Sequence, residues 1–229
     1  MSTPARMLVI SVVIMASTLV CRGSIIVTWL DEPIGIGGWW NPSTPQPVDI
    51  DGDGVVDFSF WGDQFNTSAG FRSFTLNRYL ITPSPPPNIG GAVAALDEGF
   101  LIASGSTNEY LRWFGDDHDY WSTLMSQLSS GREGEFWGVR AYIGIEFEID
   151  SAVHYGWIDV QGHSSLPNLT VYGWAYESTP GMPIMAGAIP EPSALSLIGI
   201  GAIAILYRKK SIANNRPHPT PHKCGEGGP

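Results

Sequence analysis

The sequence predicts an all-β protein whose main domain is a β-sandwich or a jelly-roll-like fold. The 229 residues include 27 Gly, 18 Pro and nine Trp, and this mixture of turn formers with aromatic residues is typical of short strands joined by tight turns. The strand-like segments are not separated by regular helical patterns, which argues against a parallel α/β sheet. The abundance of aromatic residues excludes a disordered acidic chain, and the low content of charged residues, 15%, excludes a coiled coil.

Runs of β-branched and aromatic residues between turn signals mark the expected strands. We expect the segment 71–81 to form a pair of strands or one longer strand, and the segments 138–149 and 155–160 to form a hairpin. One helix is expected at Asp116–Ser129, because apolar side chains recur there at helical spacing. The other expected strands are Ile25–Leu30, Val55–Trp61 and Leu169–Tyr176.

The first 24 residues have the pattern of a secretory signal peptide. Arg6 supplies a positive charge, residues 7–20 carry no charge and are mostly apolar, and small or polar residues follow at 21–24. We expect a signal-peptide helix in residues 1–24, with cleavage near Gly23 or Ser24. The alternatives are a buried core helix and a lipid-modified Cys21, but Leu19-Val20 is a poor lead-in to a lipoprotein cysteine.

The other end of the chain combines three features in a fixed order. Pro190, Glu191 and Pro192 precede an apolar run at 194–207, and the basic cluster Arg208, Lys209 and Lys210 follows it. As a helix, the apolar run would be about 21 Å long, which is short for a hydrocarbon core of roughly 30 Å. The sequence therefore predicts a short transmembrane helix whose basic end stays on the cytoplasmic side.

These three features together resemble the PEP-CTERM sorting signal of bacterial surface and exopolymer-associated proteins. The resemblance implies a transient anchor in the inner membrane, processing near residues 190–192 by an exosortase-type membrane protease, and sorting to the cell surface or the extracellular matrix. The family usually stops soon after the basic cluster, whereas this chain continues with residues 211–229, whose Pro-, Gly- and His-containing composition predicts a disordered tail. Segments within 155–187 also resemble PEP-CTERM ectodomains, which implies no settled chemistry.

The segment between the two ends, residues 25–189, is the expected ectodomain and is strongly acidic. It contains 20 acidic residues against five arginines and no lysine, so its formal charge is −15. Such a charge excludes nucleic acid as a partner, because a phosphate backbone requires a basic surface, and it suits the binding of cations. Both cysteines, Cys21 and Cys224, lie outside this segment, so its stability cannot depend on a disulfide.

The clearest chemical motif is an acidic loop at residues 49–57. Carboxylates at loop positions 1, 3, 5 and 9 can converge on one hard cation, and Gly54 at position 6 permits a sharp turn. An EF-hand would place Glu at position 12, where this chain has Phe60, so the loop resembles the loop-then-strand calcium sites of integrin-type repeats. We expect a structural Ca²⁺; the alternative is a solvated acidic turn without metal. The candidate ligands are Asp49, Asp51, Asp53, the carbonyl of Val55, and Asp57.

The main interpretation is a noncatalytic, secreted surface or exopolymer-associated protein, and two other classes remain open. A glycan-binding, lectin-like module could use some of the nine Trp as stacking platforms for an extracellular polysaccharide. A carbohydrate-active enzyme could use Glu146, Glu148 and Asp150, which alternate along one expected strand face. Apolar residues alternate with these three, however, so we expect them to be charged groups on the outer face. No nucleophile elbow, P-loop or dinucleotide fingerprint occurs in the sequence.

Overall fold

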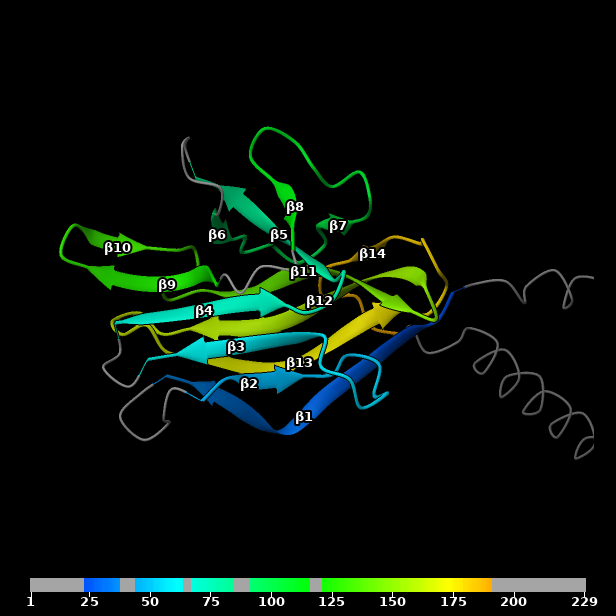
Figure 1. Ribbon diagram of the computed structural model, residues 1–229, viewed down its shortest axis with the longest axis horizontal. Coiled ribbons are helices and arrows are strands. Elements are labelled where there is room, and N and C mark those ends of the chain that lie inside the picture. Colours follow the sequence, from blue (N-terminus) through cyan, green and yellow to red (C-terminus); the bar gives the residue numbers. More distant parts are fainter. Residues whose placement is uncertain (1–22, 38–43, 64–66, 85–90, 116–120, 191–229) are drawn as a thin grey trace, which may run out of the picture. The chain divides into compact units, whose positions relative to one another are not determined.

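The computed structural model describes residues 23–37, 44–63, 67–84, 91–115 and 121–190 (Figure 1). Every helix or strand within these ranges is a β-strand, which confirms the all-β prediction. Within the same ranges, no helix has the length and hydropathy that crossing a membrane would require. Residues 1–22 of the predicted signal peptide, the predicted helix at 194–207 and the predicted tail at 211–229 lie outside the described residues. Gly23 and Ser24 are described and are not helical.

Fourteen strands are found in the described part of the chain. In chain order they are β1 Ile25–Ile36, β2 Gln46–Val48, β3 Phe58–Gly62, β4 Ser68–Ser73, β5 Arg78–Pro83, β6 Gly91–Val93, β7 Leu101–Ile102, β8 Arg112–Phe114, β9 Ser122–Leu128, β10 Gly131–Glu133, β11 Arg140–Ile149, β12 Ala152–Gly162, β13 Leu169–Glu177 and β14 Ile184–Met185.

Twelve of these strands belong to a single sheet. Its order is β1-β13-β12-β11-β5-β6-β9-β4-β3-β2, with β8 paired to β5 and β10 paired to β9, while β7 and β14 form a separate two-stranded sheet. Almost all neighbours are antiparallel, and only the short contact between β6 and β9 is parallel. A β-sandwich consists of two separate sheets packed face to face. Here the two halves of a single sheet take the place of those two layers.

The sheet curls until it is nearly closed, and the main core fills its interior (Figure 1). Buried side chains of β3 and β4, such as Phe58 and Phe71, belong to the same core cluster as Ile143 of β11 and Ile158 of β12. A Cβ atom at Gly62 would stand only 2.6 Å from the backbone nitrogen of Gly37. The end of β3 thus lies directly against the residue that follows β1.

A second, smaller core covers the outer face of β11, β12 and β13. Trp157 is fully buried there, and its indole Nε1 donates a hydrogen bond of 3.2 Å to the carbonyl oxygen of Ala188. Ile184 and Ala186 are buried in the same cluster, and the amide of Ala186 donates to the carbonyl of Phe100 at 2.8 Å. We call residues 184–188 the C-terminal strap. It holds the end of the described chain on the sheet.

Several predicted strands are confirmed. The hairpin is β11 and β12, whose pairing runs without a break from Arg140 opposite Gln161 to Ile149 opposite Ala152. The segment 71–81 contains parts of two strands, β4 and β5, rather than one long strand, and these two strands pair with other neighbours instead of with each other. The strand expected from Val55 begins only at Phe58, because the preceding residues complete the acidic loop.

The predicted helix at Asp116–Ser129 is wrong for the part that the structure describes, since residues 122–128 form strand β9. This strand lies between β4 and β6 and is covered on both faces, so Leu124 and Met125 are both completely buried. Adjacent buried residues break the alternation that marks a half-exposed strand and imitate helical spacing. Residues 116–120 lie outside the described residues.

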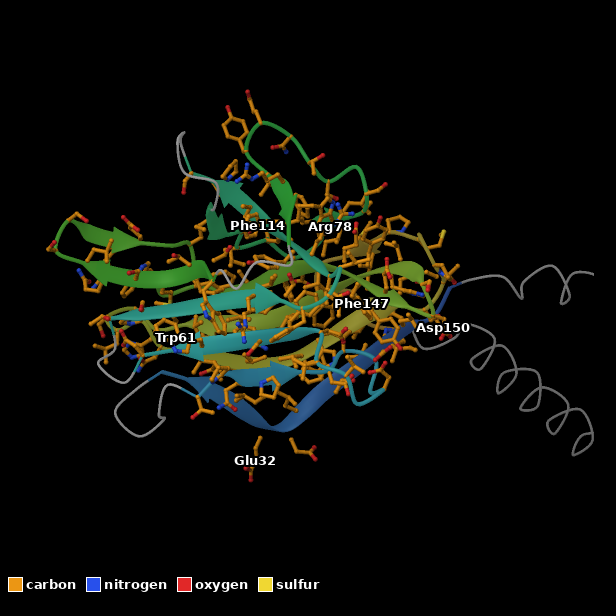
Figure 2. The ribbon with its side chains drawn as sticks, viewed as in Figure 1. Glu32, Trp61, Arg78, Phe114, Phe147 and Asp150 are labelled. Atoms are coloured by element: carbon orange, nitrogen blue, oxygen red, sulfur yellow. The ribbon has the colours of Figure 1, made fainter. Side chains whose placement is uncertain are left out.

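The prediction for the acidic face of β11 is correct only in part. Phe147 is buried as expected and lies inside the curled sheet (Figure 2). Glu146, however, is not a solvated outer charge: it is 4% exposed and forms an ion pair with Arg78 of the neighbouring strand. Asp150 is not on the strand at all, because it occupies the β11–β12 turn with φ of 51°.

Candidate metal centre

The acidic loop of residues 49–57 connects β2 to β3 and is closed by the backbone. The amide of Asp57 donates a hydrogen bond of 3.0 Å to the carbonyl of Val48, so the two strand ends are held together. Within the loop, Gly52 and Gly54 have φ of 81° and 89°. Residues with side chains rarely adopt these values, so the alternation of Asp with Gly is what allows the chain to turn back on itself twice.

The carboxylates at the start of the loop accept hydrogen bonds from its own backbone. Asp49 accepts from the amides of Gly52 and Gly54, at 2.7 and 2.8 Å. Asp51 accepts from the amide of Asp53 at 3.2 Å, and Asp53 accepts from the amide of Val55 at 2.7 Å. These bonds fix the direction of each carboxylate, as Asx turns do.

Asp57 is the buried member of the loop and joins it to the core. Its Oδ2 accepts from the amide of Ile50 at 2.8 Å, and its Oδ1 accepts from the side-chain amide of Asn77 at 2.8 Å. Asn77 in turn accepts from the amide of Glu148 at 3.2 Å. Asn77 was not among the predicted site residues, because it lies 20 positions further along the chain and only the pairing of β3 with β4 brings it to the loop.

Three of the five predicted ligand positions converge in the structure. One carboxylate oxygen from each of Asp49, Asp51 and Asp57 lies within 4.8 Å of the other two. Asp53 does not join this cluster, and both Asp53 and Val55 are exposed to solvent. An oxygen-lined cluster of this kind has the donor chemistry that Ca²⁺ prefers.

The surroundings of the cluster disfavour its negative charge. Burial raises the pKa of Asp57 to about 6, and the nearby carboxylates of Asp51 and Asp49 add to the shift, against the opposing effect of its two hydrogen bonds. Burial, followed by the charges of Asp53 and Asp49, also raises the pKa of Asp51. A bound cation would favour the ionised form of both groups.

The sorting residues predicted at the C-terminus follow the C-terminal strap in the sequence. Ala188 is bonded to Trp157, as described above, and Pro190 is exposed. Glu191, Pro192 and the basic residues Arg208, Lys209 and Lys210 lie outside the described residues.

Comparison with known families identifies this end of the chain. The model of the PEP-CTERM protein-sorting motif matches residues 188–210. The chain carries a PEP-CTERM sorting motif. This PEP-CTERM segment supports export followed by C-terminal sorting, and it implies exosortase-mediated processing at the membrane. No curated protein and no solved structure matches the chain, so the fold and the acidic loop are interpreted from their own geometry.

Proposed function

We propose that this chain is a noncatalytic bacterial protein of the cell surface or the extracellular matrix, and that its all-β domain is the passenger of the sorting motif. In this proposal a signal peptide directs export, a short helix at 194–207 holds the chain transiently in the inner membrane, and an exosortase-type protease processes it. The observation that carries the proposal is the matched motif at 188–210.

The folded domain supports this role because it reaches the motif without a spacer. The first matched residue, Ala188, is still bonded to Trp157 of β12, so the folded domain extends to the first residues of the matched motif. The domain, interpreted as a sandwich or jelly roll formed by one curled sheet, would leave the membrane as a compact unit.

A carbohydrate-active enzyme fits the geometry less well. Glu146, one of the paired carboxylates considered for that role, is buried and committed to Arg78. Catalysis by a carboxylate pair requires both groups to reach the scissile bond. A glycan-binding module remains the second candidate, and a separate cavity favours it, as argued below.

Analysis of the mature protein tests the sorting proposal. Mass spectrometry of surface protein from the native host is expected to find neither residues 1–22 nor residues 194–229. Replacing Glu191 and Pro192 by Ala should leave the C-terminal segment attached, because the protease would lose its recognition residues, whereas the control Pro180→Ala, an exposed proline outside the motif, should be processed normally. Surface protein that retains its intact C-terminus would refute the proposal.

We also propose that Asp49, Asp51 and Asp57 hold a structural calcium ion. The convergence of three carboxylates and the raised pKa values of Asp51 and Asp57 support this proposal, because four carboxylates in nine residues repel one another unless a cation balances them. The ion would tie the loop to β3.

Thermal unfolding of the full chain in mild detergent tests the calcium site. At a calcium concentration about 100-fold above Kd, binding to the folded state contributes about 2.7 kcal/mol, which corresponds to a rise in Tm of roughly 5–10 °C for a domain of this size. Asp51→Asn should abolish most of this rise. The matched control is Asp150→Asn, which removes the same charge in the β11–β12 turn, where Asn also tolerates a positive φ. An identical Tm in calcium and in chelator would exclude the site.

A further inference from the structure

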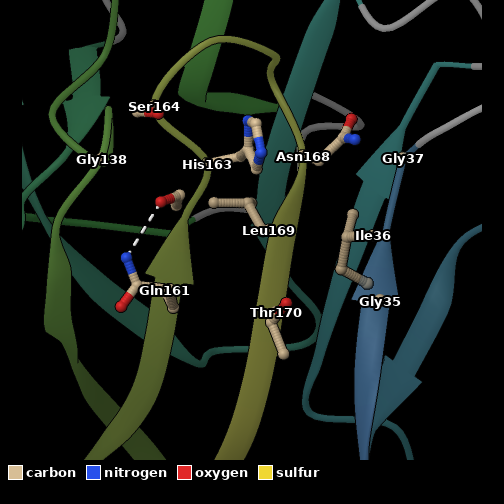
Figure 3. Close-up of a pocket in the computed structure, with 11 residues that line it drawn as sticks. Gly35, Ile36, Gly37, Gly138, Gln161, His163, Ser164, Asn168, Leu169 and Thr170 are labelled. Atoms are coloured by element: carbon tan, nitrogen blue, oxygen red, sulfur yellow. Dashed lines mark hydrogen bonds between the residues drawn. The ribbon is translucent and has the colours of Figure 1, made fainter.

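A cavity of about 530 Å³ opens where β1 and β12 end and β13 begins (Figure 3). No residue of the acidic loop lines it. This volume lies within the range of small-molecule sites, roughly 300–1,000 Å³. The polar side chains that line the cavity are Gln161, His163, Ser164, Asn168 and Thr170.

The cavity has room because Gly35, one of three residues that lie side by side on neighbouring strands, has no side chain. Gln161 of β12 is paired with Thr170 of β13, which is paired with Gly35 of β1. A Cβ atom at Gly35 would meet nothing within 4 Å. A larger residue would therefore fit at this position without disturbing the fold and would occupy the space from the β1 side.

The polar groups around the cavity offer both donors and acceptors. Nδ1 of His163 accepts from the amides of Ser165 and Leu166, at 3.2 and 3.3 Å, so the proton of the neutral ring lies on Nε2, which can donate. Gln161 donates through Nε2 to the carbonyl of Gly162 at 3.0 Å (Figure 3). Among the described residues, the buried Oδ1 of Asn168 finds no hydrogen-bond partner.

The cavity is neutral within a strongly acidic domain. None of its lining residues is Asp, Glu, Lys or Arg, although the segment 25–189 has a formal charge of −15. A site for Ca²⁺ or Mg²⁺ would need carboxylates, a site for a transition metal would need more than one His or Cys, and a site for an acidic ligand would favour Arg or Lys. The amide, hydroxyl and imidazole groups of the cavity include both hydrogen-bond donors and acceptors. They suit a ligand whose groups can each donate and accept a hydrogen bond, as sugar hydroxyls can.

We propose that this cavity binds a neutral carbohydrate, which goes beyond the sorting and calcium proposals. The amides of Gln161 and Asn168, the hydroxyl of Thr170 and Nε2 of His163 would form hydrogen bonds to hydroxyl groups of one or two sugar residues, with the rest of a polysaccharide chain left in solvent.

Titration of the full chain in mild detergent with neutral oligosaccharides tests the proposal. The probes are the hexamers of β-1,4-glucose, α-1,4-glucose and β-1,4-xylose, and a galacturonic acid hexamer is the charged comparison. Binding is measured by isothermal titration calorimetry and by saturation-transfer NMR. We expect at least one neutral hexamer to bind with Kd of about 1 mM or lower, which corresponds to about −4 kcal/mol or tighter, and the acidic hexamer to bind more weakly.

Two variants locate the binding. Gly35→Leu should weaken it at least about tenfold by occupying the cavity, and Thr170→Val should weaken it by removing one hydroxyl while keeping the side-chain shape. The matched control is Gly105→Leu, because a Cβ at Gly105 also meets nothing within 4 Å and this residue lies outside the cavity. The proposal is overturned if no neutral hexamer binds, if the acidic hexamer binds equally well, or if Gly35→Leu and Thr170→Val, each folded as judged by Tm, bind like the original chain.

Discussion

Asp57 is the acidic-loop residue whose carboxylate is buried against the core of the domain. Its carboxylate is buried, accepts hydrogen bonds from Ile50 and Asn77, and lies near Asp49 and Asp51. Burial raises its pKa from 3.8 to about 6, so in the calcium-free fold the carboxyl group keeps its proton up to a higher pH than it does in the unfolded chain. The contribution of Asp57 to stability is then present in full below about pH 4 and is lost as the pH rises through about 6.

The effect of calcium should therefore depend on pH. Because a carboxylate must be ionised to bind the ion, the rise in Tm caused by calcium is expected to be large at about pH 7.5 and small at about pH 5. The measurement is thermal unfolding of the full chain in calcium and in chelator at several pH values. Asp57→Asn serves as the comparison, since it should remove this part of the pH dependence in chelator. A calcium effect of equal size at both pH values would contradict the assignment of Asp57 as a ligand.

Residue patterns alone could identify the acidic loop but not its buried partner. Asp and Gly alternate over a few positions, and this short-range pattern predicts both the turns and the direction of the carboxylates. Asn77, which lies between β4 and β5, donates a hydrogen bond to Asp57. Arg78 of β5 contacts Glu146 across the pairing with β11. Nothing in their local sequence indicates these partners, because strand pairing is decided by the whole sheet.

At the scale of elements, the C-terminal strap is the part of the fold that connects the domain to the sorting motif. Ile184 is 3% exposed and packs in the smaller core, whereas its neighbour Met185 is 55% exposed. Ile184→Ala should destabilise the chain by about 2–4 kcal/mol, because it removes buried methyl groups and leaves a cavity. Met185→Ala should change stability by less than about 0.5 kcal/mol.

Urea unfolding of the full chain distinguishes these two variants of the strap. Equal effects of Ile184→Ala and Met185→Ala would show that the strap does not belong to the cooperative core. If Ile184→Ala has the larger effect, the strap contributes to the stability of the folded domain. Cleavage on the N-terminal side of Ala188 would then destabilise the domain, so we expect processing to occur after the strap.

The hairpin β11–β12 and strand β13 were recognised because β-branched and aromatic residues gather there between turn signals, although both faces of these strands are largely covered. Strand β9 was mistaken for a helix, because it is buried on both faces and its apolar residues no longer alternate. The burial that a strand experiences depends on its neighbours in the sheet, and a local window of sequence does not contain that information.

At the scale of the whole molecule, composition indicated the class of fold but not its topology. Many turn formers and aromatic residues predicted an all-β domain, and the structure confirms it. They could not predict that twelve strands would join one curled sheet, because a sandwich of two sheets and a nearly closed single sheet need the same alternation of residues. The cavity at the ends of β1, β12 and β13 also could not be predicted, since its lining comes from segments more than 100 residues apart.

The curled sheet has one further consequence, which concerns the edge strand β1. A free strand edge is a template on which another chain can add its own strand, and this is a common start of aggregation. Here the end of β1 meets β3. The middle of β1 is interrupted by a bulge that contains Asp31, Glu32 and Pro33, and Glu32 projects away from the strand (Figure 2). Two like charges and a residue without an amide hydrogen therefore oppose the pairing of another chain's strand with the middle of β1.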